Sequence, residues 1–286
     1  MLIHVVKPGD TVYSIALEYG IPMSQLILDN GLETSSRLAV GQALVVQFPT
    51  QTHTVQPRET LASIAAAYQL PLRQLYRNNP ILGGIPEIYP GQTLVLAYDS
   101  TPEATLSVNG YAYPFIDPAL LQSTVPYLTY LTPFTYGFTP DGTLVELDDE
   151  ALLAAARQGG AAPLMHLSTL TEEGGFSNEL AHLALTQPAV QDTLVDNLEA
   201  MLVQKGYRGL DIDFEFLPGE DAQAYAQFVG RMRELLSPMG MPVLVALAPK
   251  VSADQPGTLY EGHNYRLLSQ AADFVLLMTY EWGYTY

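Results

Sequence analysis

Apolar and acidic residues alternate without exception along residues 210–216, LDIDFEF, and this alternation predicts a β-strand. Side chains two positions apart share one face of a strand, so Asp211, Asp213 and Glu215 are expected to lie together, roughly 7 Å apart in succession. The opposite face would carry Leu210, Ile212, Phe214 and Phe216. The spacing of the three acids fits catalysis and a site for Mg²⁺ or Ca²⁺ about equally well. The apolar alternates disfavour a solvated edge strand.

Further strand patterns alternate with helical patterns from residue 105 onward. The predicted strands are 106–113, 127–136, 162–168, 209–216, 242–249 and 274–282. Amphipathic helices are predicted near 148–158, 178–204, 220–237 and 262–271. This order predicts an α/β fold with a parallel sheet, and specifically a (β/α)8 TIM-type barrel. Such a barrel has eight strands, so the pattern predicts one that is truncated after strand 6.

The first third of the chain contains an internal repeat, which begins at His4 and again at His53. Matching pairs include His4 and His53, Val6 and Val55, Thr11 and Thr60, Ile15 and Ile64, Tyr19 and Tyr68, and Asn30 and Asn79. Each copy reads as a short strand, two helices and a closing strand, a small βααβ module. Thr11 and Thr60 are predicted to cap the first helix of each copy.

Charge narrows the range of partners. The 286 residues contain 12 Lys plus Arg and 30 Asp plus Glu, a formal net charge of −18. This charge disfavours nucleic acid and anionic lipid surfaces, and no apolar run is long enough to span a membrane. Neutral glycans remain open as ligands. The start of the chain, MLIHVVKPGD, lacks the pattern of a secretory signal peptide.

The repeated pattern V-x-x-G-D-T, then I-A-x-x-Y-G, L-x-x-x-N and G-Q-x-L, resembles the LysM module, which binds N-acetylglucosamine chains of peptidoglycan or chitin. The resemblance implies a shallow glycan groove in each copy, and two weak sites on one chain would bind a polymer by avidity. The implied contact residues are Gly9, Asp10, Thr11, Val12 and Asn30 in the first copy and Arg58, Glu59, Thr60, Leu61 and Asn79 in the second. Arg58 and Glu59 depart from the usual Gly-Asp.

These patterns divide the chain into four parts. Residues 1–49 and 50–97 are the predicted LysM modules, 98–104 form a linker rich in Ser, Thr and Pro, and 105–286 form the barrel.

The barrel resembles the family 18 glycoside hydrolases. GLDIDFE is similar to their D-G-x-D-x-D-x-E signature, and LLMTYEW resembles their sixth-strand M-x-Y-[DE] motif. Arg208 stands where the signature has its first Asp, outside the catalytic trio. The combination of LysM modules with MTYEWG is similar to spore cortex-lytic N-acetylglucosaminidases.

The resemblance implies a role for each residue of the motifs. Glu215 would be the general acid and base, Asp213 would orient the substrate's acetamide, Asp211 would share its charge, and Tyr280 would donate to the acetamide oxygen. Substrate contacts are expected from Trp282, Glu281, Met278, Tyr111 and Phe134. His166 is interpreted as a buried, hydrogen-bonded core residue. No metal or other cofactor is expected.

The sequence therefore predicts a retaining, substrate-assisted hydrolase that cleaves N-acetylglucosaminyl bonds in peptidoglycan, most naturally of the spore cortex. The alternatives are a chitinase, or a non-catalytic glycan-binding spore coat protein, because the predicted barrel is incomplete. The expected partner is a peptidoglycan or chitin-like N-acetylglucosamine polymer, and the expected location is the spore cortex, the spore coat or the cell wall. The patterns predict no oligomeric state.

Overall fold

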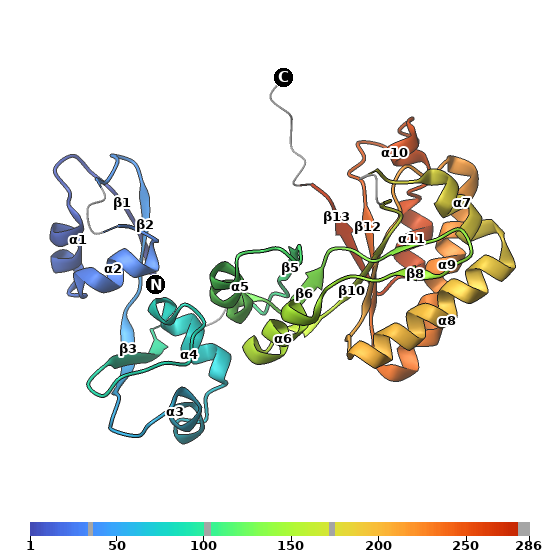
Figure 1. Ribbon diagram of the computed structural model, residues 1–286. Coiled ribbons are helices and arrows are strands. Elements are labelled where there is room, and N and C mark those ends of the chain that lie inside the picture. Colours follow the sequence, from blue (N-terminus) through green and yellow to red (C-terminus); the bar gives the residue numbers. More distant parts are fainter. Residues whose placement is uncertain (34–36, 100–103, 172–174, 280–286) are drawn as a thin grey trace. The chain divides into compact units, whose positions relative to one another are not determined.

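The computed structural model describes residues 1–33, 37–99, 104–171 and 175–279. The chain forms two compact units (Figure 1). Unit 1 is Met1–Val108 with Asp117–Leu128, and unit 2 is Asn109–Ile116 with Thr129–Tyr286. Within the described ranges, no helix is both long and apolar enough to cross a bilayer.

Unit 1 contains the two repeat copies, and each has the predicted order of strand, two helices and strand. The first copy consists of β1 (Leu2–Val5), α1 (Val12–Tyr19), α2 (Met23–Asp29) and β2 (Ala43–Val46). The second consists of β3 (Pro49–Thr54), α3 (Leu61–Ala67), α4 (Leu72–Asn78) and β4 (Thr93–Tyr98). The two strands of each copy pair antiparallel, and each copy encloses its own apolar core.

The two predicted helix caps are confirmed. Thr11 precedes α1, and its hydroxyl oxygen accepts a hydrogen bond from the backbone N–H of Ser14. The hydroxyl oxygen of Ser14 in turn accepts a hydrogen bond from the backbone N–H of Thr11. Thr60 and Ser63 form the same capping box ahead of α3. This arrangement satisfies N–H groups that the first helical turn leaves without partners.

Asn30 and Asn79 tie the second helix of each copy to its closing strand. The Asn79 amide donates to the carbonyl oxygens of Leu75 and Val95, and its Oδ1 accepts from the Val95 N–H. Asn30 makes the corresponding three bonds in the first copy. Both amide hydrogens are used within the fold, so these two residues of the predicted glycan set serve to position the backbone.

The six predicted strands of unit 2 are confirmed, and they pair in parallel and in chain order. They are β5 (Asn109–Ala112), β6 (Tyr130–Pro133), β9 (Ala162–Pro163) continued by β10 (Met165–Ser168), β11 (Leu210–Asp213), β12 (Val243–Leu247) and β13 (Phe274–Leu277). A bridge between Tyr136 and Leu167 carries the pairing from the β6 strand to β10. This succession of parallel strands is consistent with a TIM-type barrel.

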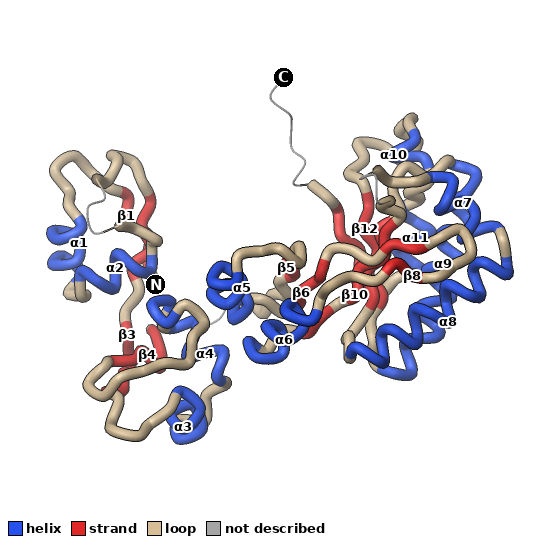
Figure 2. Tube along the Cα trace, viewed as in Figure 1, coloured by secondary structure: helices blue, strands red, loops and turns tan. Residues whose placement is uncertain are grey.

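Helices cover one side of these strands (Figures 1 and 2). They are α6 (Glu150–Gly159), α7 (Asn178–Thr186), α8 (Pro188–Lys205), α9 (Ala222–Leu236) and α11 (Tyr265–Ala271). The short helix α10 (Thr258–Glu261) lies beyond the end of β12 (Figure 1). One large apolar cluster fills the space between α7, α8 and α9 and the strands. The helices hold the sheet from outside and leave its other face to the side chains of the candidate site.

Two features differ from the predicted elements. The helix expected over 178–204 is interrupted at Gln187, because Pro188 lacks an N–H and begins α8 as a new helix. A short antiparallel hairpin, β7 (Gly137–Phe138) and β8 (Leu144–Val145), was not predicted, since its strands have only two residues each.

A third difference concerns α5 (Pro118–Thr124) and the single 3₁₀ turn after it, Val125–Tyr127. This segment lies within the predicted barrel sequence, but it belongs to unit 1. Arg77 of α4 donates from Nε to the Pro126 carbonyl at 2.7 Å. A side chain at Gly84 would collide with the Gln122 carbonyl, so the contact requires glycine at that position.

Replacing Asn79 by Ala should destabilise the second repeat copy by about 2–4 kcal/mol, because it leaves buried backbone groups of Leu75 and Val95 without partners. Hydrogen exchange followed by mass spectrometry on the full chain would measure the loss in peptides that cover 53–97. Arg73→Ala, on the exposed face of α4, is the control and should change stability by less than about 0.5 kcal/mol. Equal effects of the two substitutions would contradict a stabilising role of the Asn79 hydrogen bonds.

Asp29 should make unit 1 less stable as the pH rises. Burial raises the pKa of Asp29 to about 6, although Gln25 donates a hydrogen bond to Asp29 Oδ1. The folded state therefore holds this proton more tightly than the unfolded state, and stability is lost as the pH rises from about 4 to above 6. After allowance for partial exposure, the loss is about 1–2 kcal/mol.

Asp29→Asn should remove this dependence. The variant should match the parent near pH 4 and exceed its stability near pH 7, in urea unfolding of the full chain at both pH values. A variant that is less stable than the parent at pH 7 would contradict the prediction.

Candidate active site

The two faces of β11 meet different surroundings, as the alternation predicts. Leu210, Ile212 and Phe214 are fully buried in the helix-covered core. The Phe214 ring stacks on Tyr225 and Phe228 of α9, with centroid distances of 5.5 and 5.7 Å.

Phe216 does not continue the alternation. The regular strand ends at Asp213, and Phe216 has a φ of +56° and is 38% exposed. The prediction that Phe216 shares the apolar face is therefore wrong, because the chain turns before it.

Asp211 is fully buried on the opposite face, and Tyr111 of β5 donates its hydroxyl to Asp211 Oδ2 at 2.5 Å. Burial raises the pKa of Asp211, and the charge of the neighbouring Asp213 adds to this effect. His166 and the Tyr111 hydroxyl act in the other direction. The position therefore favours a carboxyl group that keeps its proton to higher pH than an exposed aspartic acid.

Asp213 lies one step nearer the carboxyl end of β11 and is only 4% exposed. Its Oδ2 is 3.6 Å from Nε2 of His166, which extends from β10. The Oδ1 atoms of both Asp211 and Asp213 are buried without a hydrogen-bond partner among the described residues. Unpaired buried carboxylate oxygens are costly to the fold, and Asp213 lines a pocket from which a ligand could donate a hydrogen bond to it.

His166 is buried, as predicted, and it is held in place on two sides. Its Nδ1 lies 2.6 Å from the Thr135 hydroxyl, which also donates to Ser168. The rings of Tyr111 and Phe134 pack against it with centroid distances of 5.5 and 4.7 Å. His166 also contacts Asp213, so it belongs to the site as well as to the core.

A pocket of about 320 Å³ opens above these groups. Its lining residues are Tyr111, Ala112, Tyr113, Phe134, His166, Asp213, Ala246 and Met278. Apart from His166, which lies within β10, they come from the carboxyl ends of the strands or from the residues just beyond them. Parallel α/β folds place their active sites at this end of the sheet. The pocket is large enough for one small ligand.

The structure brings several predicted site residues together. Tyr111, Phe134 and Met278 line the same pocket as Asp213, and Asp211 lies behind it through its bond to Tyr111. Glu215 follows just beyond the end of β11 and is partly exposed. Tyr280, Glu281 and Trp282 lie outside the described residues.

Aromatic side chains continue from the pocket toward solvent. Tyr113 packs edge-on against Phe134, with centroids 5.2 Å apart, and stacks on Phe115 at 5.0 Å. Phe115 is 82% exposed. Neither Tyr113 nor Phe115 was predicted as a site residue. Tyr113 is the last residue of the predicted strand 106–113 and Phe115 lies beyond it, and only the fold shows which way the chain turns after β5.

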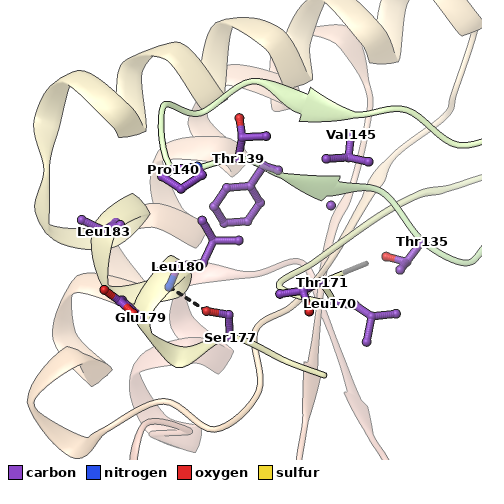
Figure 3. A pocket seen from close by; sticks show the side chains of 12 residues that line it. Thr135, Thr139, Pro140, Val145, Leu170, Thr171, Ser177, Glu179, Leu180 and Leu183 are labelled. Atoms are coloured by element: carbon purple, nitrogen blue, oxygen red, sulfur yellow. Dashed lines mark hydrogen bonds between the residues drawn. The ribbon is translucent and has the colours of Figure 1, made fainter. Parts of the chain in front are cut away.

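A second, larger cavity of about 700 Å³ lies beside the first, between the β7–β8 hairpin and the start of α7 (Figure 3). Thr135 lines this cavity and lies within hydrogen-bond distance of His166, which lines the first cavity. Threonine hydroxyls and the Glu179 carboxylate lie around its apolar surface. Ser177 is occupied in capping α7, where its hydroxyl accepts from the Leu180 N–H.

The predicted LysM contact loops take equivalent shapes in the two copies of unit 1. Gly9 and Arg58 both have left-handed backbones, with φ of +91° and +74°, and Arg58 adopts this conformation despite its side chain. The carboxylates that follow, Asp10 and Glu59, each accept a backbone N–H across the turn and bond to the histidine of β1 or β3.

These loops are therefore built by the same bonds in both copies, although the second departs from the Gly-Asp pattern. Backbone hydrogen bonds, aided by the histidine, lower the pKa of Asp10 and of Glu59. Val12 and Leu61 begin the helices that follow.

The described residues contain no group of three His, Cys, Asp or Glu side chains that could hold a metal ion.

Comparison with known proteins identifies both regions. The LysM domain family matches residues 4–47 and 53–97, and the Glycosyl hydrolases family 18 matches residues 122–284. The chain is 38% identical over 291 residues to the cortical fragment-lytic enzyme of Bacillus subtilis (strain 168), covering all of this chain and 67% of the relative. It is 36% identical to the enzyme of the same name from Bacillus anthracis, covering 98% of this chain and 65% of the relative.

The crystal structure of the Bacillus cereus spore cortex-lytic enzyme SleL is also similar, with a TM-score of 0.74 and 32% identity over 99% of this chain and 66% of that one. The chain thus spans about two thirds of the length of these relatives. The chain belongs to glycosyl hydrolases family 18, and it carries LysM domains ahead of the hydrolase region.

Proposed function

We propose that this chain cleaves N-acetylglucosaminyl bonds in the peptidoglycan of the spore cortex, by a retaining mechanism in which the substrate assists. The observation that carries the proposal is the buried pair Asp211 and Asp213 on β11. Asp213 lines the pocket, Asp211 lies behind it, and Glu215 follows two residues after the strand ends. The names of the cortex-lytic relatives support the choice of substrate.

In the first step, Glu215 protonates the glycosidic oxygen as the bond from that oxygen to the anomeric carbon breaks. The acetamide oxygen of the same sugar attacks the anomeric carbon, so the intermediate is a cyclic oxazolinium ion and no enzyme carboxylate becomes a nucleophile. The unpaired Oδ1 atom of Asp213 is suited to accept the acetamide N–H.

In the second step, Glu215 takes a proton from water, and the water oxygen bonds to the anomeric carbon as the oxazolinium ring opens. Two displacements on one carbon leave its configuration unchanged. Asp211 holds or shares a proton with Asp213 through the cycle, and the Tyr111 hydroxyl keeps Asp211 in place.

The larger cavity and the exposed ring of Phe115 give the substrate room beyond one sugar. The LysM domains would hold the chain on the glycan, and the expected partner is therefore peptidoglycan. The cortex-lytic relatives favour a spore-associated location.

Glu215→Gln should lower the rate of hydrolysis of cortex fragments by about 10²–10⁴-fold and leave binding intact, since the amide cannot donate the proton. The rate is measured on purified cortex fragments and, in parallel, on chitin oligomers. Proton NMR of the first product should show the anomer of the substrate. Glu220→Gln, five residues on and exposed, is the matched control and should hydrolyse at the parent's rate.

An inverted first product would contradict the mechanism, and undiminished hydrolysis by Glu215→Gln would contradict the assignment of the acid. Faster turnover of chitin oligomers than of cortex would overturn the choice of substrate and indicate a chitinase.

Tyr111→Phe should raise the pKa of Asp211 further, because the Tyr111 hydroxyl now lowers it. Loss of a hydrogen bond to a charged group is worth about 1.5–3 kcal/mol, so we expect kcat to fall about tenfold or more. Carbon-13 NMR of labelled aspartate side chains measures the titration. Tyr113→Phe, from the same segment, should leave the Asp211 titration where it is in the parent; a shift of equal size would contradict the prediction.

A further inference from the structure

His263 is fully buried between the carboxyl ends of β11 and β12. The backbone N–H of Ala248, just past β12, donates to His263 Nδ1 at 2.9 Å. On the other side of the ring, Nε2 lies 2.9 Å from the carbonyl oxygen of Phe214. Phe214 is the residue directly before Glu215, so the imidazole bridges the backbone next to the acid to the neighbouring strand.

These two partners fix the protonation of the ring. A backbone N–H can only donate, so Nδ1 must be without a proton, and a carbonyl can only accept, so Nε2 must carry one. His263 is therefore neutral and in a single tautomer. Burial lowers the pKa of His263, which agrees with the geometry, although the Phe214 carbonyl and Asp213 favour the charged form.

The loop that carries His263 is fitted closely to the chain after Glu215. The Gly262 N–H donates to the Leu217 carbonyl at 3.0 Å, and a Cβ at Gly262 would lie 2.2 Å from the Leu217 Cβ. The Lys250 ammonium donates to the carbonyls of Tyr260 and His263 at 3.0 and 3.1 Å. The imidazole therefore has little freedom to move away from Phe214.

We infer that His263 is a positioning residue for Glu215, which it holds through the Phe214 carbonyl. The inference rests on the proposed function of Glu215. The carbonyl of Phe214 and the N–H of Glu215 belong to one rigid peptide plane. His263 holds that plane from one side, and the stacking of the Phe214 ring on Tyr225 and Phe228 holds the preceding residue from the other.

Two substitutions of His263 distinguish the effects of its two hydrogen bonds. In His263→Gln, the longer side chain would place its NH₂ group near the position of Nε2 and keep the bond to Phe214. In His263→Asn, the shorter side chain would place its oxygen near the position of Nδ1 and keep only the bond from Ala248. Each variant retains one of the two hydrogen bonds, so similar losses of stability are expected, whereas only His263→Asn frees the peptide before Glu215.

The test is hydrolysis of cortex fragments by the full chain, with kcat and KM measured for both variants. His263→Asn should lower kcat by about 10²-fold, the effect of a displacement of about 1 Å, and leave KM nearly unchanged. His263→Gln should recover most of that loss. Tyr265→Phe is the matched control: it removes bonds to Ala248 and Lys250 in the same loop but none to Phe214, and should leave kcat unchanged.

A second measurement does not depend on turnover. The carbon-13 carboxyl signal that disappears in Glu215→Gln identifies Glu215, and its titration midpoint should move in His263→Asn and stay at the parent's value in His263→Gln. Equal midpoints in the two variants, equal losses of kcat, or a loss in Tyr265→Phe as large as in His263→Asn would overturn the inference. Full activity of Glu215→Gln would instead overturn the proposed function, while the titration would still decide whether His263 positions residue 215.

Discussion

The burial of two carboxyl groups side by side on β11 is the constraint on which the site depends. An ionised carboxylate taken out of water loses several kcal/mol of hydration unless other groups replace it. Tyr111, which comes from β5, supplies one such group to Asp211, and His166 approaches Asp213. Strands distant in sequence are thereby joined by the electrostatics of two side chains as well as by backbone pairing.

The helices satisfy the complementary requirement. Apolar alternates of β11 pack against α9 on the outer side, and this packing keeps the acids on the inner side, because a shift of one residue would exchange the two faces. The ring stack of Phe214 with Tyr225 and Phe228 therefore fixes the register of the strand that carries the acids. The apolar packing on one face of β11 therefore determines that the acids lie on the other face.

Local sequence was enough to predict the parts of the structure that depend on neighbouring residues. The six strands, the duplicated βααβ order and the caps at Thr11 and Thr60 follow from periodicity and side-chain chemistry. The break before Pro188 was missed because the apolar pattern continues through it. The roles of His166 and His263 depend on contacts with Asp213 and Phe214, residues 47 and 49 positions away, and no local pattern encodes such pairs. The roles of the individual site residues stay predictions.

The hydrogen bonds between the two repeat copies have a consequence for the proposed binding of a long glycan. Gln25 of the first copy donates both to Asp29 and to the Tyr98 hydroxyl of the second, and Tyr98 donates to the Asn78 carbonyl. These bonds join the copies directly, so the folded protein fixes the distance between the loop at Gly9 in the first copy and the loop at Arg58 in the second. Under the proposed binding of glycan by both copies, a saccharide shorter than this distance would contact one copy alone, and one that spans it would gain the binding free energy of both.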